Sequence, residues 1–99
     1  MSAYFLLDVS AINDEAKMEE YRRGVFATVE RYRGRYLIIG GEQRPLEGNW
    51  QPTFPVLIEF ENLEQANRWY TSDEYRDLLK LRLEATDGWG VLIDGYRPS

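Results

Sequence analysis

The chain of 99 residues contains no histidine and no cysteine. Without histidine, the common zinc sites, histidine-ligated haem and every catalytic triad of the serine–histidine type are excluded. Without cysteine, disulfides, thiolate metal ligands and cysteine nucleophiles are excluded as well. The sequence therefore predicts no metal site and no cofactor, and any proton transfer would fall to a carboxylate, a tyrosine or a lysine.

The chain also lacks an excess of basic residues and any long apolar run. Its net charge is −5, with 17 acidic and 12 basic residues, whereas nucleic-acid binding needs a basic surface that displaces counterions. No segment approaches the roughly 20 apolar residues of a membrane span, and the N-terminus has no basic segment typical of a signal peptide. We expect one cytoplasmic domain over residues 1–99, with neither nucleic acid nor membrane as partner.

The pattern of apolar residues and helix caps predicts two helices and four strands. The first helix carries one apolar stripe at spacings of three and four, and the second breaks at Thr71-Ser72, where a second capping pattern begins. Asn13 and Asn62 are the expected N-caps, Gly34 the expected stop, and Pro55 suggests an edge strand. The expected elements are strands 3–9, 35–41, 54–61 and 89–96, and helices 14–32 and 62–82.

This order, β-α-β-β-α-β, predicts an α+β, ferredoxin-like fold: a four-stranded antiparallel sheet with the helices on one face. Alternation assigns Phe5, Leu7, Val9, Val56, Ile58, Phe60, Val91 and Ile93 to the helix-facing side. The other side would hold Tyr4, Leu6, Asp8, Leu57, Glu59, Leu92 and Asp94. That second set is too apolar for open solvent, so we expect a homodimer in which two sheets face each other around a semi-polar lumen.

Three segments carry a family resemblance: GRYLIIGG at 34–41, EGNW at 47–50 and VLIEFENLEQANRWYTSDEYRDLLKLR at 56–82. They resemble the bacterial domain-of-unknown-function 1330 family, which belongs to the dimeric α+β barrel superfamily. The resemblance extends from Tyr4 to Gly95 and implies the same ferredoxin-like fold, paired into a dimeric barrel. It implies no activity, because none is established for the family.

The chain departs from the family pattern at two positions. Family members often carry a basic residue just before the Gly-Gly pair and another shortly before the apolar run of the third strand. Ile39 and Phe54 occupy these places here. If those cations bind an anionic ligand in relatives, the resemblance implies that this chain lacks that site.

Glu59 and Asp8 are the candidate catalytic residues. Burial and like-charged neighbours raise the pKa of a carboxylate, and such a group can act as a general base. The resemblance adds that related dimeric barrels include small isomerases and cofactor-free monooxygenases. The alternative is structural: each carboxylate pairs with an arginine, caps a backbone segment or lies at the wet mouth of the barrel.

Five residues are candidates for binding a ligand. Four are aromatic, and a flat pocket between helices and sheet would use them; a core or dimer interface would use them equally. Arg82 offers a bidentate fork for a carboxylate, or a structural tether. The five are Tyr21, Trp50, Trp69, Tyr70 and Arg82.

Two functions remain open at this point. The first is a module that binds a small organic molecule in the barrel cavity. The second is a cofactor-independent enzyme, isomerase-like or monooxygenase-like, with a carboxylate base. An enclosed cavity faced by an unpaired Glu59 would favour chemistry, and a cavity filled by side chains would favour a structural role.

Overall fold

The computed structural model describes residues 2–98 and has the predicted order of elements, with the second helix divided in two. The division falls at the expected place, because the Ser72 hydroxyl caps a new helix by accepting a hydrogen bond from the Tyr75 amide. Within residues 2–98, no helix has the length and apolar character needed to cross a membrane. The elements are β1 (Ala3–Ile12), α1 (Glu15–Arg31), β2 (Arg35–Ile39), β3 (Pro55–Phe60), α2 (Leu63–Tyr70), α3 (Asp73–Ala85) and β4 (Thr86–Asp94).

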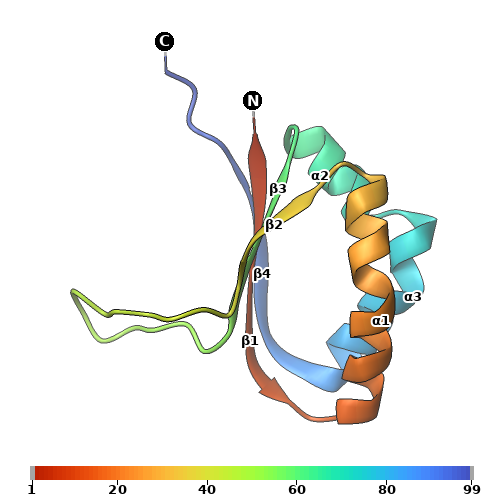
Figure 1. The fold of residues 1–99 in the computed structure, drawn as a ribbon, viewed down its shortest axis with the longest axis horizontal. Helices are drawn as coiled ribbons and strands as arrows, with labels where there is room; N and C mark the ends of the chain where they lie inside the picture. Colours follow the sequence, from red (N-terminus) through yellow and green to blue (C-terminus); the bar gives the residue numbers. More distant parts are fainter. Residues whose placement is uncertain (1, 99) are drawn as a thin grey trace.

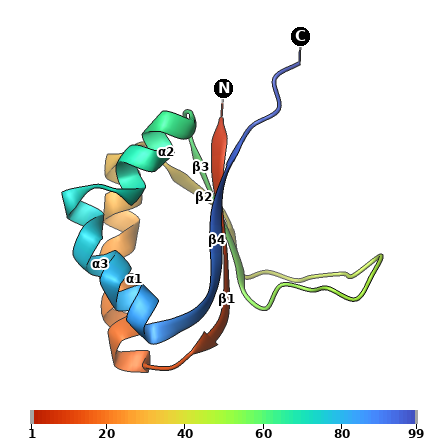
Figure 2. The same ribbon diagram turned by 180° about the vertical axis from the view of Figure 1, so that it is seen from behind.

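The four strands form one antiparallel sheet in the order β2-β3-β1-β4. All three helices lie against one face of this sheet (Figure 1). Residues 40–54, which we call the arm, leave the sheet on the opposite side, and the view from behind shows the same separation (Figure 2). This is the α+β, ferredoxin-like arrangement that the sequence predicts.

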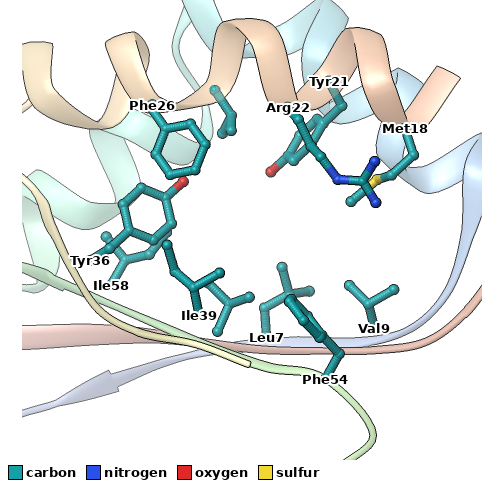
Figure 3. A pocket seen from close by; sticks show the side chains of 12 residues that line it. Leu7, Val9, Met18, Tyr21, Arg22, Phe26, Tyr36, Ile39, Phe54 and Ile58 are labelled. Atoms are coloured by element: carbon teal, nitrogen blue, oxygen red, sulfur yellow. The ribbon is translucent and has the colours of Figure 1, made fainter. Parts of the chain in front are cut away.

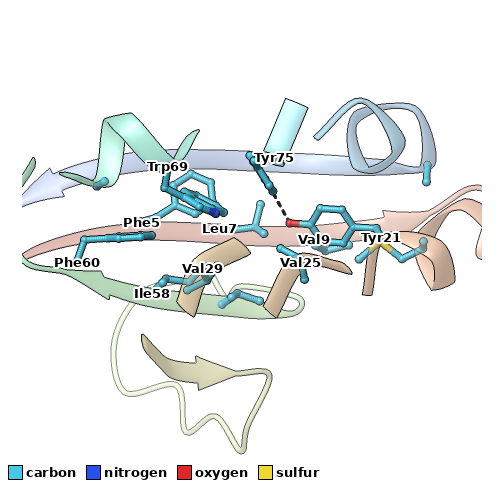
Figure 4. Packing of buried hydrophobic residues seen from close by; sticks show 14 residues of the cluster. Phe5, Leu7, Val9, Tyr21, Val25, Val29, Ile58, Phe60, Trp69 and Tyr75 are labelled. Carbon is cyan, nitrogen blue, oxygen red and sulfur yellow. Dashed lines mark hydrogen bonds between the residues drawn. The ribbon is translucent and has the colours of Figure 1, made fainter. Parts of the chain in front are cut away.

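The core lies between the helices and the covered face of the sheet (Figure 4). The apolar stripe of α1 is confirmed, because Met18, Tyr21, Val25 and Val29 are all buried. Trp69 of α2 is fully buried and packs on Phe60 and Tyr75. From the sheet, the core takes Phe5, Leu7, Val9, Val56, Ile58 and Phe60.

Both ends of α1 differ from the prediction. Asp14, not Asn13, is the N-cap, and its carboxylate accepts from the Lys17 amide at 3.1 Å. At the other end Arg33, not Gly34, adopts the left-handed conformation, with φ of 62°. Gly34 is needed for space, since a Cβ there would lie 2.6 Å from the Phe60 ring.

The side assignment of the last strand was wrong. Register places Val91 opposite Leu6 and Ile93 opposite Tyr4, so both point away from the helices. Leu92 and Asp94 fall on the helix-facing side instead. Apolar character alone misassigned the strand, because aliphatic residues occupy both of its faces.

Pro55 is also not in an edge strand. β3 lies between β2 and β1. A proline is tolerated at the first residue of a strand, where its missing N–H removes no interior ladder bond. Its carbonyl still accepts a hydrogen bond from the Gly40 amide at 2.8 Å.

The uncovered side of the sheet, which we call the open face, is largely apolar. Its members follow from the register, which pairs Tyr4 with Glu59 and Leu6 with Leu57. The arm rises beside it and brings Trp50 within 6.1 Å of the Trp89 ring, measured between centroids. The open face comprises Tyr4, Leu6, Asp8, Arg35, Ile38, Pro55, Leu57, Glu59, Trp89, Val91 and Ile93.

Candidate functional site

An apolar pocket of about 130 Å³ lies between α1 and the sheet (Figure 3). We call it the α1 pocket. The apolar stripe of α1 forms one wall, and helix-facing residues of three strands form the other. Its lining residues are Leu7, Val9, Met18, Tyr21, Arg22, Val25, Phe26, Tyr36, Ile39, Phe54, Val56 and Ile58.

Tyrosine hydroxyls supply polar groups at this pocket. Tyr21 lines it, and its hydroxyl lies 2.8 Å from the hydroxyl of Tyr75, so that one phenol donates to the other (Figure 4). Burial raises the pKa of Tyr21 well above its usual value, and burial also raises the pKa of Tyr36 and of Tyr75. At neutral pH these phenols are therefore uncharged and act as hydrogen-bond donors and acceptors, not as bases.

A second cavity, of about 160 Å³, lies between α3 and the strands β1 and β4, and we call it the α3 pocket. Tyr70 and Arg82 both line it. Arg82 is buried, and its guanidinium carbon lies 5.9 Å from the centre of the Tyr21 ring. Tyr21 thus belongs to the α1 pocket and also contacts the cation of the α3 pocket.

Glu59 lies on the open face and away from both pockets. Its Oε1 accepts a hydrogen bond from Nε of Arg35 at 2.6 Å. A hydrogen bond from Ser2, followed by that from Arg35, lowers the pKa of Glu59 below its usual value. This is the opposite direction from the raised pKa that the general-base hypothesis requires.

Asp8 is buried, and its carboxylate is hydrogen-bonded to the backbone of the arm. Its two carboxylate oxygens accept hydrogen bonds from the amides of Phe54 at 2.7 Å and Thr53 at 3.2 Å. Asp94, on the helix-facing side of β4, pairs with Arg97 at 3.2 Å. The register places Asp8 and Glu59 on the open face, as expected, whereas the expected placement of Asp94 on that face was wrong.

The remaining aromatic candidates are dispersed. Trp69 is in the core, where its indole N–H donates to the Thr28 hydroxyl at 3.0 Å. Trp50 is exposed on the arm. Of the candidate ligand-binding residues, the structure brings Tyr21, Tyr70 and Arg82 close to the two pockets and leaves Trp50 and Trp69 outside them.

Sequence reasoning missed Tyr36 as a pocket residue. The register of β2 shifts between Tyr36 and Ile38, so the bulge at Leu37 puts Tyr36 and Ile39 on the same, helix-facing side. Simple alternation cannot anticipate such a bulge. The sequence did carry one indication of where the pocket lies, because Ile39 and Phe54, the two positions that depart from the family pattern, both line the α1 pocket.

The described residues offer no obvious metal centre. Between residues 2 and 98 no three aspartate or glutamate side chains lie close enough together to hold a metal ion. The α1 pocket, with its apolar walls, suits an uncharged molecule better than a phosphate-bearing cofactor.

Solved structures share the fold at low sequence identity. A protein of unknown function from Rhodopseudomonas palustris is 16% identical with a TM-score of 0.73, covering 98% of this chain and 84% of its own. A dimeric protein of unknown function from Bacteroides fragilis is 13% identical with a TM-score of 0.57, covering 95% of each chain. SnoaB, a cofactor-independent oxygenase from Streptomyces nogalater, is 12% identical with a TM-score of 0.58, covering 98% of this chain and 93% of its own.

A family comparison covers almost the whole chain. No curated protein sequence matches it. The family described as Domain of unknown function (DUF1330) matches residues 2–96, which include every strand and helix described above. The chain therefore belongs to the DUF1330 family and has the ferredoxin-like α+β fold.

Proposed function

We propose that the protein binds a small, largely apolar organic molecule in the α1 pocket. The observation that carries this proposal is an apolar cavity of about 130 Å³ with tyrosine side chains in its wall. An engineered apolar cavity of about 150 Å³ binds benzene. The size therefore favours a ligand of about one ring, below the usual range of drug-sized sites.

The tyrosines favour a ligand with one polar substituent. A buried hydroxyl group that finds no partner costs about 1–3 kcal/mol. A ligand hydroxyl or carbonyl group placed near Tyr21 or Tyr36 would gain a hydrogen bond, while its ring contacts Val25 and Ile58. A phenol or a small ketone has this combination of groups.

A second candidate is a cofactor-independent enzyme. The fold shared with SnoaB, which is described as such an oxygenase, favours it. Against it, neither Asp nor Glu is among the residues lining the α1 pocket. Glu59 and Asp8 already have partners elsewhere, so a base would have to be a tyrosine whose pKa is raised. We therefore place binding ahead of proton-transfer chemistry.

We also propose that the protein is a homodimer that pairs through the open face. Val91 and Ile93 on this face are 43% and 46% exposed, and contiguous apolar surface of this kind marks interaction sites. The dimeric state of the Bacteroides fragilis protein with the same fold supports the proposal. The exposed Trp50 on the arm would then contact the partner.

Occlusion of the α1 pocket tests the binding function. Ile39 lines the pocket at its surface and is 51% exposed, while Leu37 on the same strand is 44% exposed and does not line it. The substitution Ile39→Trp should block the pocket, and Leu37→Trp is the matched control. Thermal unfolding is measured with toluene, phenol and cyclohexanone as probes.

We expect at least one probe to stabilise the wild type and Leu37→Trp but not Ile39→Trp. At one hundred times its Kd, a ligand adds about 2.7 kcal/mol to the free energy of unfolding. The proposal fails if no probe stabilises the wild type, or if the probes stabilise Ile39→Trp equally well.

A further inference from the structure

The α3 pocket differs from the α1 pocket in character, because it combines the charged residues Asp8 and Arg82 with glycine backbone, whereas the α1 pocket is apolar except for Arg22 and its tyrosines. Arg82, Tyr70 and Thr86 contribute to it, together with the glycines at positions 88 and 90. The last turn of α3 leads directly into β4 (Figure 2), and residues of both elements line the cavity. Leu83, which is mostly exposed, lines it as well and places it near the surface.

At the cavity, the helix-facing positions of β4 are glycines, whereas Leu92 and Asp94 occupy the helix-facing positions further along the strand. Register places Gly90 opposite Leu7 and Gly88 opposite Val9, two residues that point toward the helices. A Cβ at Gly90 would lie 2.8 Å from the Phe5 ring, and one at Gly88 would collide with the Asp8 carbonyl. The Phe5 ring thus packs against Gly90, and β1 approaches Gly88 closely, while both glycines line the cavity beside α3.

Arg82 brings an unpaired charge to this cavity. Its side chain is only 5% exposed, and its Nε has no hydrogen-bond partner. Among the described residues 2–98, the ion pairs engage Lys17 and other arginines, and no carboxylate pairs with Arg82. Because arginine stays protonated in proteins, the buried group is a cation. Asp8 also lines the cavity, but its two carboxylate oxygens accept hydrogen bonds from the Thr53 and Phe54 amides of the arm.

The surrounding groups compensate this charge only in part. The Tyr21 ring lies within cation–π distance of the guanidinium, and this contact is weakly favourable. The C-terminal end of α3 also favours a positive charge. Both effects are smaller than the cost of burying an unpaired charge. An anion in the adjoining cavity would supply the missing partner.

We propose that the α3 pocket is a binding site for a small carboxylate, with Arg82 as the group that recognises it. The planar guanidinium presents a fork of N–H donors that matches the two oxygens of a carboxylate. Tyr70 offers a phenol hydroxyl as a further donor. The Thr86 hydroxyl donates to the Arg82 carbonyl at 2.7 Å and so fixes the end of the helix that carries the arginine.

The site goes beyond the proposed function, because it uses a different cavity and a different ligand chemistry. It also differs from the cationic positions of the family pattern, which are Ile39 and Phe54 here and lie at the α1 pocket. The net charge of −5 does not attract anions at long range, so recognition must come from the local fork. The two pockets can be tested independently.

The test compares Arg82→Met with Arg76→Met. Arg76 is exposed on the same helix and pairs with Asp73, so its substitution removes a charge without touching the cavity. Thermal unfolding of the wild type and both variants is followed while sodium acetate or sodium propionate replaces sodium chloride at constant ionic strength. Sodium phosphate serves as a third anion.

We expect acetate or propionate to raise the Tm of the wild type and of Arg76→Met, and to leave the Tm of Arg82→Met unchanged. A charge-assisted hydrogen bond contributes enough that its loss weakens carboxylate binding roughly tenfold or more. The proposal is overturned if Arg82→Met keeps the shift, or if phosphate and chloride act as strongly as the carboxylates. It is also overturned if acetate has no effect on the wild type, which is the outcome for a purely structural arginine.

If Arg82→Met does not fold, a measurement on the wild type alone tests the proposed carboxylate site. The buried Nε–H of Arg82 should give a slowly exchanging ¹H–¹⁵N resonance that is separate from those of the exposed arginines. Titration with acetate should shift that resonance in a saturable way. The proposal is overturned if the Arg82 resonance does not shift with acetate while the resonances of other arginines do.

Discussion

Glu59 and Arg82 have opposite surroundings, although either could be proposed from sequence as a functional charge. Glu59 has a side chain that is 18% exposed, and Arg35 and Ser2 hold it in its ionised form. Arg82 is more deeply buried, and within residues 2–98 no carboxylate pairs with it and its Nε has no hydrogen-bond partner. At the residue scale, a charged group that already has a partner is part of the scaffold, and one without a partner is available to a ligand.

The pairing of Glu59 leads to a prediction about pH. Its pKa is lower in the folded state than the usual 4.5. A lowered folded pKa stabilises the protein above the unfolded pKa, and this stabilisation is lost as pH falls through the folded value. We expect Glu59→Gln to be less stable than the wild type at pH 7, and the difference to shrink at pH 3.5.

The effect should be small, about 0–1 kcal/mol, because Arg35 is mostly exposed and its ion pair is screened by solvent. Urea unfolding at the two pH values measures it, with Glu47→Gln on the exposed arm as the control. A difference between Glu59→Gln and wild type that is equal at both pH values would contradict the assignment.

At the scale of elements, the side chain of Asp8 holds the base of the arm against the sheet. Asp8 in the middle of β1 accepts two amide hydrogen bonds from the base of the arm, at Thr53 and Phe54. Phe54 also lines the α1 pocket. The same contact therefore orders the arm and holds one wall of the candidate site.

The substitution Asp8→Asn should loosen this junction. An asparagine presents one acceptor oxygen, and its NH₂ group would face a backbone N–H that needs an acceptor. We expect a loss of about 1–3 kcal/mol in the free energy of unfolding and faster amide hydrogen exchange at Thr53 and Phe54. Asp77→Asn, at an exposed position of α3, is the control. Unchanged exchange at the two amides would show that other contacts hold the arm.

The elements themselves were largely predictable, whereas the pockets were not. Local signals determine the α1 stripe and the helix break before Ser72, because each depends on residues three or four apart. The facing of β4 and the position of Tyr36 depend on register and on a bulge, which are set between strands distant in sequence. The pairing of Glu59 and the isolation of Arg82 are likewise products of the tertiary structure.

At the scale of the whole molecule, the protein has two layers, one of helices and one of strands, and one face of the sheet is uncovered. Its shortest principal extent is 17 Å, against 46 and 36 Å for the others. A chain of this size buries only about 60–65% of the surface of its unfolded state. The helices cover one face of the sheet, and the open face has the arm beside it but no layer over it (Figures 1 and 2).

Charge introduced into the open face tests the proposed homodimer. In Val91→Lys a cation replaces an apolar side chain opposite Leu6 in the register. In an isologous dimer the same surface of both subunits forms the contact, so the interface would hold one added charge from each subunit. We expect light scattering after size exclusion to give a dimer for the wild type at micromolar concentration and a monomer for Val91→Lys. Leu63→Lys, at an exposed apolar position on α2, should remain dimeric. A monomeric wild type would contradict the sheet-to-sheet pairing. A dimeric Val91→Lys would show that the dimer forms through another surface. Neither result would bear on the proposals for the two pockets beneath the helices.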